Sequence, residues 1–398
     1  MKNCLPFLPL FAFVALLPRI SGAAEKITVT VANELNMTRP NQTVAVPWSE
    51  IASRLPGATM DHLQVRNPSG AIIPMQVTNF HPEMKGGHAD DLIFQHDFAA
   101  ADRLVEFTIE KTGKPVPPFS SKVFARYVPE RFDDFAWEND RIAHRTYGPA
   151  LESPNAGKEQ LRASGLDIWC KRVRYLIVDR WYLRGHENYH KDNGEGLDMY
   201  GVHTTRGDGG TGVWDGKQLH VSHNWKTWRV LANGPIRAVF ELTYEPWDAG
   251  EGVKVSETKR FTVDAGSNLD RIDSTFTVEG NKKEITAAVG LAKHDKIPAA
   301  FASDREAGWM SLWEDYPKDG SVGVGVVMNT SELDSFAEDA ENHLALAKAV
   351  SDRPLRYYAG ACWSQGSDFA TKEDWNAYLA AFAKRIASPL KILDIEAK

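Results

Sequence analysis

The sequence predicts an all-β protein in two parts, and three observations carry this prediction. Short runs of alternating apolar and polar residues, such as Ile27, Val29 and Val31, fill residues 26–111. Longer, more aromatic runs of the same kind follow, the first of them over residues 164–183, separated by Gly, Asn and Asp turns. A strong helical period is found only at residues 371–389. We therefore expect a small β-sandwich, then two large antiparallel sheets packed face to face, with one C-terminal helix.

The start of the chain is typical of a secretory signal peptide. Lys2 precedes an apolar run at residues 5–17, and small residues follow at 21–24. This run is too short to cross a membrane, and no later stretch is long and apolar enough to do so. We therefore expect residues 1–24 to be removed from a periplasmic protein without a membrane span.

A Pro- and Gly-rich segment at residues 112–122 predicts the boundary between the two parts. On this interpretation the small N-terminal domain covers residues 25–115 and the large domain covers residues 120–398. The small domain has a plausible size for an independent unit. Within it, the sequence PWSEIASRLPG is the one short helical candidate.

Charge excludes some classes of partner. The chain has 46 basic and 53 acidic side chains, and loss of the signal peptide removes Lys2 and Arg19, which leaves a net charge of about −9. Such a balance disfavours nucleic acid and anionic membranes. The remaining cysteines, Cys170 and Cys362, either form a disulfide or stay as two buried thiols, and the oligomeric state stays open.

Residues 184–212 combine many reactive side chains with almost no aliphatic ones. They include His186, His190, Lys191 and His203, together with five carboxylates and eight glycines. Long loops without apolar residues of their own are uncommon unless they bind something. We interpret this stretch as a functional loop and not as core; the alternative is a plain surface loop.

A second polar cluster lies at residues 132–152. Glu138, His144, Arg145 and Tyr147 combine a fixed positive charge with an imidazole and a phenol. Arginine binds a carboxylate with two hydrogen bonds, and histidine or tyrosine can move a proton. The alternative is a solvated strand edge with ordinary Arg–Glu pairs.

Twelve tryptophans favour a carbohydrate ligand, because several, Trp225 among them, lie in or near polar loops where a flat ring can stack on a sugar. Any single tryptophan can equally be core. The chain has no GxSxG elbow, P-loop, GxGxxG turn or CxxC pair.

A metal site has weaker support in the same stretch. His186 and His190 with His203 would admit a transition metal, but a spacing of four suits a helix and this stretch is rich in glycine. Asp192, Glu195 and Asp198 would admit Ca²⁺ without the full EF-hand pattern. We expect no metal.

The order of five further motifs resembles a family of exported bacterial proteins long catalogued as a domain of unknown function. These motifs are WENDRIAHRTYG, GLDIWCKR, YHKDNGEGLDMYG, GDGGTGVWDGK and LANGPIRAVFELTY. The family includes oligosaccharide dehydratases of ulvan breakdown, which remove water from a non-reducing-end uronic acid and leave a 4,5-unsaturated sugar. The resemblance implies a galactose-mutarotase-like β-supersandwich, related to polysaccharide lyases.

Such an elimination needs a group to neutralise the carboxylate, a base for the C5 proton and an acid for the 4-hydroxyl, but no redox cofactor. Arg145 is the expected neutraliser, His190 the expected base, and Tyr147 or Tyr200 the expected acid. Lys191 can serve as neutraliser or hydroxyl polariser. His144 completes the catalytic set, and the expected substrate contacts are Glu138, His186, Asp198, His203 and Trp225. A polysaccharide lyase, a mutarotase-like epimerase or a non-catalytic sugar-binding protein remain as alternatives.

Overall fold

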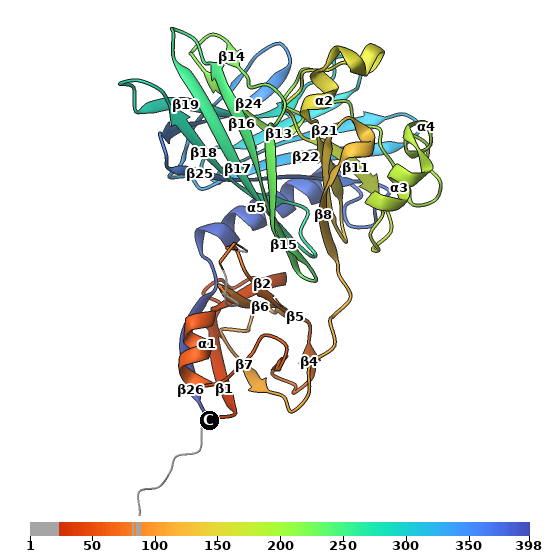
Figure 1. Cartoon of the computed structure of the whole chain (residues 1–398). Helices are drawn as coiled ribbons and strands as arrows, with labels where there is room; N and C mark the ends of the chain where they lie inside the picture. The colour runs from red at the N-terminus through yellow and green to blue at the C-terminus, as the bar shows by residue number, and fades with distance from the viewer. Residues whose placement is uncertain (1–23, 82, 85–88) are drawn as a thin grey trace, which may run out of the picture.

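The computed structural model describes residues 24–81, 83–84 and 89–398, and it consists of a small and a large β-rich part (Figure 1). The predicted signal peptide, residues 1–24, lies outside the described residues except for Ala24. No helix in the described ranges is long and apolar enough to cross a membrane. The all-β prediction is confirmed, with antiparallel pairing throughout the named strands.

The small part holds two antiparallel sheets with the strand orders β26-β1-β7-β3-β4 and β2-β6-β5. Their inward side chains, including Ile27, Val29 and Val31, form one buried core, as the alternating pattern predicts. The predicted short helix is α1 (Trp48–Arg54). The strands are β1 (Lys26–Ala32), β2 (Arg39–Pro47), β3 (Leu63–Arg66), β4 (Ile72–Ile73), β5 (Met75–Thr78), β6 (Asp91–Phe98) and β7 (Leu104–Lys111).

The last strand, β26 (Lys391–Ala397), joins the small part, whereas the expected boundaries assign its residues to the large one. It pairs antiparallel with β1, and the two lie side by side in Figure 1. Ile392 and Ile395 pack on the small core. Pairing with β26 covers an edge of β1 that would otherwise leave backbone groups unpaired, a requirement that no local pattern in the sequence reveals.

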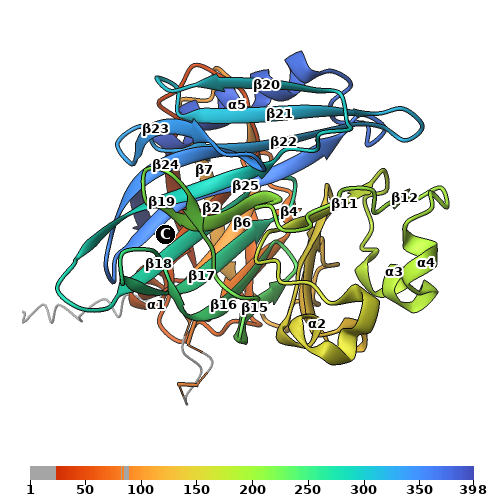
Figure 2. The same cartoon turned by 90° about the horizontal axis from the view of Figure 1, so that it is seen from above.

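The large part contains two packed antiparallel sheets, seen from above in Figure 2. Their facing side chains form the largest buried core. The eight-stranded sheet consists of β15 (Thr227–Gly234), β16 (Arg237–Asp248), β17 (Lys254–Asp264), β18 (Asp270–Val278), β25 (Pro354–Trp363), β22 (Gly320–Met328), β21 (Trp309–Tyr316) and β20 (Ala299–Asp304). The five-stranded sheet consists of β14 (Leu219–His220), β13 (Asp208–Trp214), β19 (Glu284–Ala292), β24 (Asn342–Val350) and β23 (Leu333–Glu338).

A third sheet lies at one end of this sandwich and carries the short helices α3 and α4 (Figure 2). Trp137 on this sheet donates to Asp270 of β18 at 2.7 Å, which joins the third sheet to the sandwich. Its strands are β8 (Val123–Val128), β9 (Asp134–Asn139), β10 (Ala143–Thr146), β11 (Asp167–Lys171) and β12 (Gly196–Leu197).

The helices agree in part with the sequence analysis. The C-terminal helix α5 (Lys372–Ala387) begins after Thr371, whose hydroxyl accepts from the Asp374 backbone N–H at 3.2 Å. The prediction of one strand run over residues 164–183 is wrong in its second half, which forms α3 (Val178–Arg184). The remaining short helices are η1 (Pro129–Arg131), α2 (Pro149–Glu152), η2 (Pro154–Glu159) and α4 (His186–Tyr189).

The first residues of α3 explain the change from strand to helix. Glu138, on β9 of the third sheet, accepts hydrogen bonds from the backbone N–H groups of Ile177 and Val178. These groups are unpaired donors at a helix start, and a buried carboxylate there stabilises the helix. A tertiary partner 39 residues away along the chain thus overrides the apolar run that predicts a strand.

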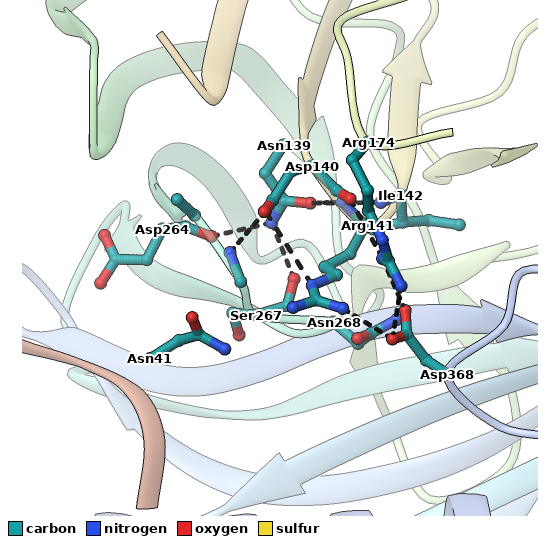
Figure 3. A network of polar contacts seen from close by, with 12 residues as sticks. Asn41, Asn139, Asp140, Arg141, Ile142, Arg174, Asp264, Ser267, Asn268 and Asp368 are labelled. Atoms are coloured by element: carbon teal, nitrogen blue, oxygen red, sulfur yellow. Dashed lines mark hydrogen bonds and ion pairs between the residues drawn. The ribbon is translucent and has the colours of Figure 1, made fainter. Parts of the chain in front are cut away.

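The turn between β9 and β10 is fastened to the sandwich by ion pairs (Figure 3). Arg141 and Arg174 both donate to Asp368, at 2.6 and 2.7 Å, and the Asp140 carboxylate accepts from the Gly266 backbone N–H at 2.6 Å. The segments that carry Arg141 and Arg174 therefore meet at the Asp368 carboxylate, shortly before α5. These contacts fix the third sheet relative to α5.

We expect Asp368→Ala to lower the free energy of unfolding by about 1–2 kcal/mol, because two partly exposed guanidinium groups lose their acceptor. Urea denaturation measures this loss. Arg174→Ala is the control, and a smaller loss is expected because Arg141 keeps its partner. Wild-type stability in Asp368→Ala would show that these ion pairs contribute nothing.

Cys170 and Cys362 are both free and buried. Of the two alternatives, the structure therefore shows two buried thiols and not a disulfide. Burial raises the pKa of each thiol well above its usual range. Neither cysteine is a candidate nucleophile.

Candidate functional site

The stretch at residues 184–212 is less exposed than the sequence analysis predicts. Glu195, Gly196 and Leu197 are buried, and the last two form β12 against β11. A side chain at Gly196 would lie 2.0 Å from the Cys170 carbonyl oxygen, and this glycine has φ +134°. Only glycine therefore permits this approach of the two strands. The interpretation that the stretch is not core is wrong for this part.

The two polar clusters of the sequence meet at Arg145. Its Nη2 donates to Asp198 at 2.8 Å, its Nε to Asp167 at 2.6 Å and its Nη1 to the Tyr189 hydroxyl at 3.1 Å. The Tyr147 hydroxyl donates to the same Asp167 oxygen at 3.0 Å. Residues 138–147 and 186–203 are thus in direct contact.

Arg145 itself lies inside the protein and is only 5% exposed. Burial alone would lower the pKa of this guanidinium, but the charges of Asp167 and Asp198 outweigh it and raise the pKa. Its positive charge is therefore already paired with protein carboxylates. This position differs from the expected role of Arg145 as the group that meets a substrate carboxylate.

Glu138, His144, Tyr147 and Trp225 are also interior. Glu138 forms an ion pair of 2.7 Å with Lys171, and both side chains are fully buried. His144 lies between Asp208 and Asp270, with nitrogen–oxygen distances of 3.5 and 3.6 Å. Trp225, which is 2% exposed, and Tyr147 belong to the large core. Their contacts are with the protein, so they do not reach a substrate in this structure.

Asp198 is also buried, and it connects Arg145 to an exposed imidazole. His190 Nδ1 lies 2.9 Å from the Asp198 backbone carbonyl oxygen and 3.6 Å from its carboxylate. Burial and the charge of Asp167 raise the pKa of Asp198 well above its usual range, against the opposing effect of Arg145. Asp198 thus acts as a link between the interior cluster and His190.

The geometry around His190 fixes its tautomer. A carbonyl oxygen can only accept, so His190 Nδ1 carries the hydrogen and the Nε2 of the neutral ring is an acceptor. His186 is one helical turn earlier, and its Nε2 lies 3.3 Å from that Nε2. Both side chains are 39% exposed. His190 therefore presents an unprotonated nitrogen at the surface, with a donor from His186 next to it.

His186 is suited to remain neutral. Burial lowers its pKa, and the charges of Arg131 and His190 lower it further. Lys191, the residue after His190, is exposed. Together, His190, His186 and Lys191 form an exposed group that offers one acceptor, one donor and one cation, in that order.

A cavity of about 450 Å³ lies beside the same segment. Met199, directly after Asp198, lines it, and so does His203, an exposed residue with a left-handed φ of 47°. Tyr200 is buried between these two residues, and its hydroxyl has no hydrogen-bond partner among the described residues. Burial raises the pKa of the Tyr200 phenol well above its usual range, so Tyr200 keeps its proton.

The opposite wall of the cavity contains residues that the sequence analysis missed. His294 Nδ1 lies 2.8 and 2.9 Å from the two Glu314 carboxylate oxygens, and His294 Nε2 lies 2.5 Å from the Gly201 carbonyl oxygen. The Tyr316 hydroxyl donates to Glu314 at 3.2 Å. The signal in the sequence is the polar run KHDK at 293–296, directly after the apolar run of residues 284–292, together with the polar and aromatic residues EDY at 314–316.

The carboxylates proposed for Ca²⁺ do not converge. Asp192 is bound by Arg172 at 2.5 Å, Glu195 by Arg184 at 2.7 Å, and Asp198 by Arg145. Within the described ranges, no group of three or more His, Cys, Asp or Glu side chains is arranged to hold a metal ion.

Comparison with known proteins gives one family and a few relatives. Residues 31–392 match the family described as "Domain of unknown function (DUF4861)". A relative from Formosa agariphila, described as uncharacterized protein P7, is 31% identical over 381 residues, which cover 93% of each chain.

Two solved structures from Enterococcus faecalis are also similar. One is described as an alpha-mannosidase and the other as a protein in glycosyl hydrolase family 38, with 9% and 10% identity and TM-scores of 0.48. The matches cover 94% and 95% of this chain but 46% and 48% of theirs, so this chain spans about half the length of those proteins.

Proposed function

Starting from the fact that this chain belongs to the DUF4861 family, we propose that it is an oligosaccharide dehydratase. The substrate is a polysaccharide fragment, of ulvan type, with a uronic acid at its non-reducing end. The enzyme removes water across C4 and C5 and leaves a 4,5-unsaturated uronate. The sequence motifs that resemble ulvan dehydratases support this activity, and the residues at the surface of the site supply its chemistry.

The observation that carries the proposal is the state of His190. Its Nδ1 is held by the Asp198 carbonyl at 2.9 Å, so its exposed Nε2 is the acceptor. A general base needs such a nitrogen at a position that a substrate can approach. On substrate binding, the sugar C5–H takes the position beside Nε2 that the His186 N–H now occupies.

The bonds and protons of the proposed elimination balance as follows. The C5–H bond breaks, its proton goes to His190 Nε2, and its electron pair forms the C4=C5 double bond. The C4–O bond breaks at the same time, and the hydroxyl leaves as water after it receives a proton. No oxidant, reductant or cofactor takes part.

Tyr316 is the phenol best suited to supply the proton to the leaving hydroxyl. It is half-buried and lines the cavity, whereas the hydroxyls of Tyr147 and Tyr200 are buried. Burial and the Glu314 charge raise the Tyr316 pKa above its usual value, so the phenol is protonated at neutral pH. Lys191 is the exposed cation beside His190 and can polarise the same hydroxyl.

Mass spectrometry of a digested uronate oligosaccharide tests the proposal. A dehydratase gives a product that is lighter by one water, with unchanged chain length and new ultraviolet absorption from the conjugated double bond. A lyase, which can use the same residues with the next sugar as leaving group, gives shorter chains. Unchanged oligosaccharide on every uronate tested would refute catalysis and leave a sugar-binding protein.

A further inference from the structure

We propose that the cavity beside residues 199–205 is an anion subsite that binds the carboxylate of the uronic acid. Lys296 supplies its neutralising charge and His203 a second donor, while His294, which is paired with Glu314, lies at its wall. This inference rests on the proposed function, and it moves the neutralising charge from the interior Arg145 to a place that a substrate can reach. Four features of the cavity carry it.

The first feature is that His294 is surrounded by acceptors. Its Nε2 faces the Gly201 carbonyl oxygen at 2.5 Å, and its Nδ1 is almost equally far from both Glu314 oxygens, at 2.8 and 2.9 Å. A neutral imidazole has one N–H and could satisfy one of these partners. Both contacts are hydrogen bonds when both nitrogens carry hydrogen and the ring is an imidazolium.

The electrostatic environment agrees with this geometry. Burial alone would lower the pKa of His294, but the hydrogen bond and charge of Glu314 outweigh it and raise the pKa. Tyr200 packs edge-on against the ring, with ring centroids 5.0 Å apart. The imidazolium is thus held in one orientation at the wall of the cavity, and its side chain is 13% exposed.

The second feature is the donors at the mouth. Within the described part of the chain, Lys296 has no acidic side chain within ion-pair distance, and His203 has no hydrogen-bond partner. The third cation, Lys293, is already paired with Glu338 at 3.3 Å. Lys296 and His203 therefore have donors free for a ligand, as a carboxylate requires.

The third feature is the backbone that places His203. Its φ of 47° is uncommon for a residue with a side chain, and such conformations cluster at ligand sites. A Cβ at Gly201 would lie 2.9 Å from the His203 Nε2. Glycine at position 201 therefore makes room for the His203 ring, while its carbonyl holds His294.

The fourth feature is the connection to the base. Met199 lines the cavity, and the carbonyl of the preceding residue, Asp198, orients His190. The carboxylate of a uronic acid is bonded to C5, so a group that binds it must lie close to the base that takes the C5 proton. Binding the carboxylate at this cavity also withdraws charge from C5 and makes its proton easier to remove.

The experiment compares a uronate oligosaccharide with its methyl ester, which lacks the charge but keeps the ring. Binding to the full chain is measured by calorimetry in a His190→Asn background, so that the acid is not consumed. We expect tighter binding of the acid than of the ester, and a loss of about 10-fold in affinity for the acid alone in Lys296→Met. Lys226→Met is the matched control, because Lys226 is exposed and pairs with Glu245 elsewhere.

The outcomes test the anion subsite and the proposed dehydratase activity independently. Equal loss for acid and ester in Lys296→Met, or no loss, overturns the subsite even if the wild type dehydrates its substrate. A charge-dependent loss in a protein whose wild type produces no dehydrated sugar supports the subsite and refutes the dehydratase. His203→Ala must show the same selective loss for the acid.

A second test measures the protonation state of His294 directly. The titratable and charged groups around its ring are Glu314 and Tyr316 on β21, Tyr200 on the facing segment, and Lys293 and Asp295 beside it. Lys296 and Glu341 line the same cavity. We expect nitrogen NMR of the full chain to show both ring nitrogens protonated at neutral pH. A neutral ring at pH 7 would overturn the imidazolium at the wall of the cavity and, with it, the first feature of the subsite.

The sign of the stability effect follows from the raised pKa. A histidine with a folded-state pKa above about 6.5 contributes stability that is complete below that pH and is lost as pH rises through the folded-state pKa. The difference in melting temperature between the wild type and His294→Gln should therefore be largest at acidic pH and shrink above neutral pH. A difference that grows with pH has the opposite sign and contradicts the imidazolium.

Discussion

His190→Asn is expected to lower kcat on a uronate oligosaccharide by about 10²–10⁴-fold, the usual contribution of a general base. The asparagine amide nitrogen can occupy the position of His190 Nδ1 and still donate to the Asp198 carbonyl. The segment that lines the cavity should then keep its conformation. Only the acceptor nitrogen that receives the C5 proton is removed.

The effect should fall on kcat and leave substrate affinity nearly unchanged, because proton abstraction occurs only in the transition state. His190→Ala should reduce kcat at least as much. His223→Ala is the control, since His223 is an exposed histidine that pairs with Glu152 away from the cavity. If His190→Asn keeps near-normal turnover, His190 is not the base, and the neighbouring His186 becomes the residue to test.

The fold could be predicted from the sequence to the extent that it depends on local patterns. Alternating residues such as Ile27, Val29 and Val31 become the buried face of β1. Thr371 is the N-cap of α5, as the sequence predicts. The helix α3 could not be predicted, because Glu138 stabilises its first turn from another strand. The partner of β26 likewise depends on which strand edge is left open by the rest of the fold.

Only the part of the candidate site whose residues are close in sequence could be predicted. The spacing of His186 and His190 indicates their contact once the segment is helical, although the glycines nearby argue against a helix. His294 and Glu314 lie in different strand runs, at the ends of β19 and β21, which belong to different sheets. Their contact with Gly201 follows from how the sheets pack, and no spacing in the sequence encodes it.

The expected roles of Arg145 and His144 illustrate the same limit. Reactive residue types in a polar cluster predict chemistry, but they serve equally well as an interior network. His144 stacks on Trp137 and lies between two buried aspartates. Burial, which separates the two cases, is a property of the tertiary structure.

Arg145→Met is expected to lower the free energy of unfolding by about 3–5 kcal/mol, the usual cost of removing one partner from a buried ion pair. Methionine fills much of the volume but leaves Asp167 and Asp198 without their shared donor. Arg145→Lys should recover little of this loss, because an ammonium cannot donate in the three directions that the guanidinium uses. Arg356→Ala, at an exposed arginine paired with Asp273, is the control and should cost less than about 1 kcal/mol.

The pH dependence separates a structural Arg145 from one that binds substrate. Burial already raises the pKa of Asp198, and it raises that of Asp134, 3.6 Å from Arg145, to about 6. Carboxyl groups with raised folded-state pKa values bind protons more readily in the folded protein, so acid stabilises the folded state relative to the unfolded one. Removal of Arg145 should raise these pKa values further, and the stability gap between Arg145→Met and the wild type should narrow as pH falls from 8 towards 5, a range set by these aspartates. If Arg145→Met unfolds like the wild type at every pH but no longer distinguishes a uronate oligosaccharide from its methyl ester, the guanidinium binds the substrate carboxylate after all, and the cavity at His294 does not.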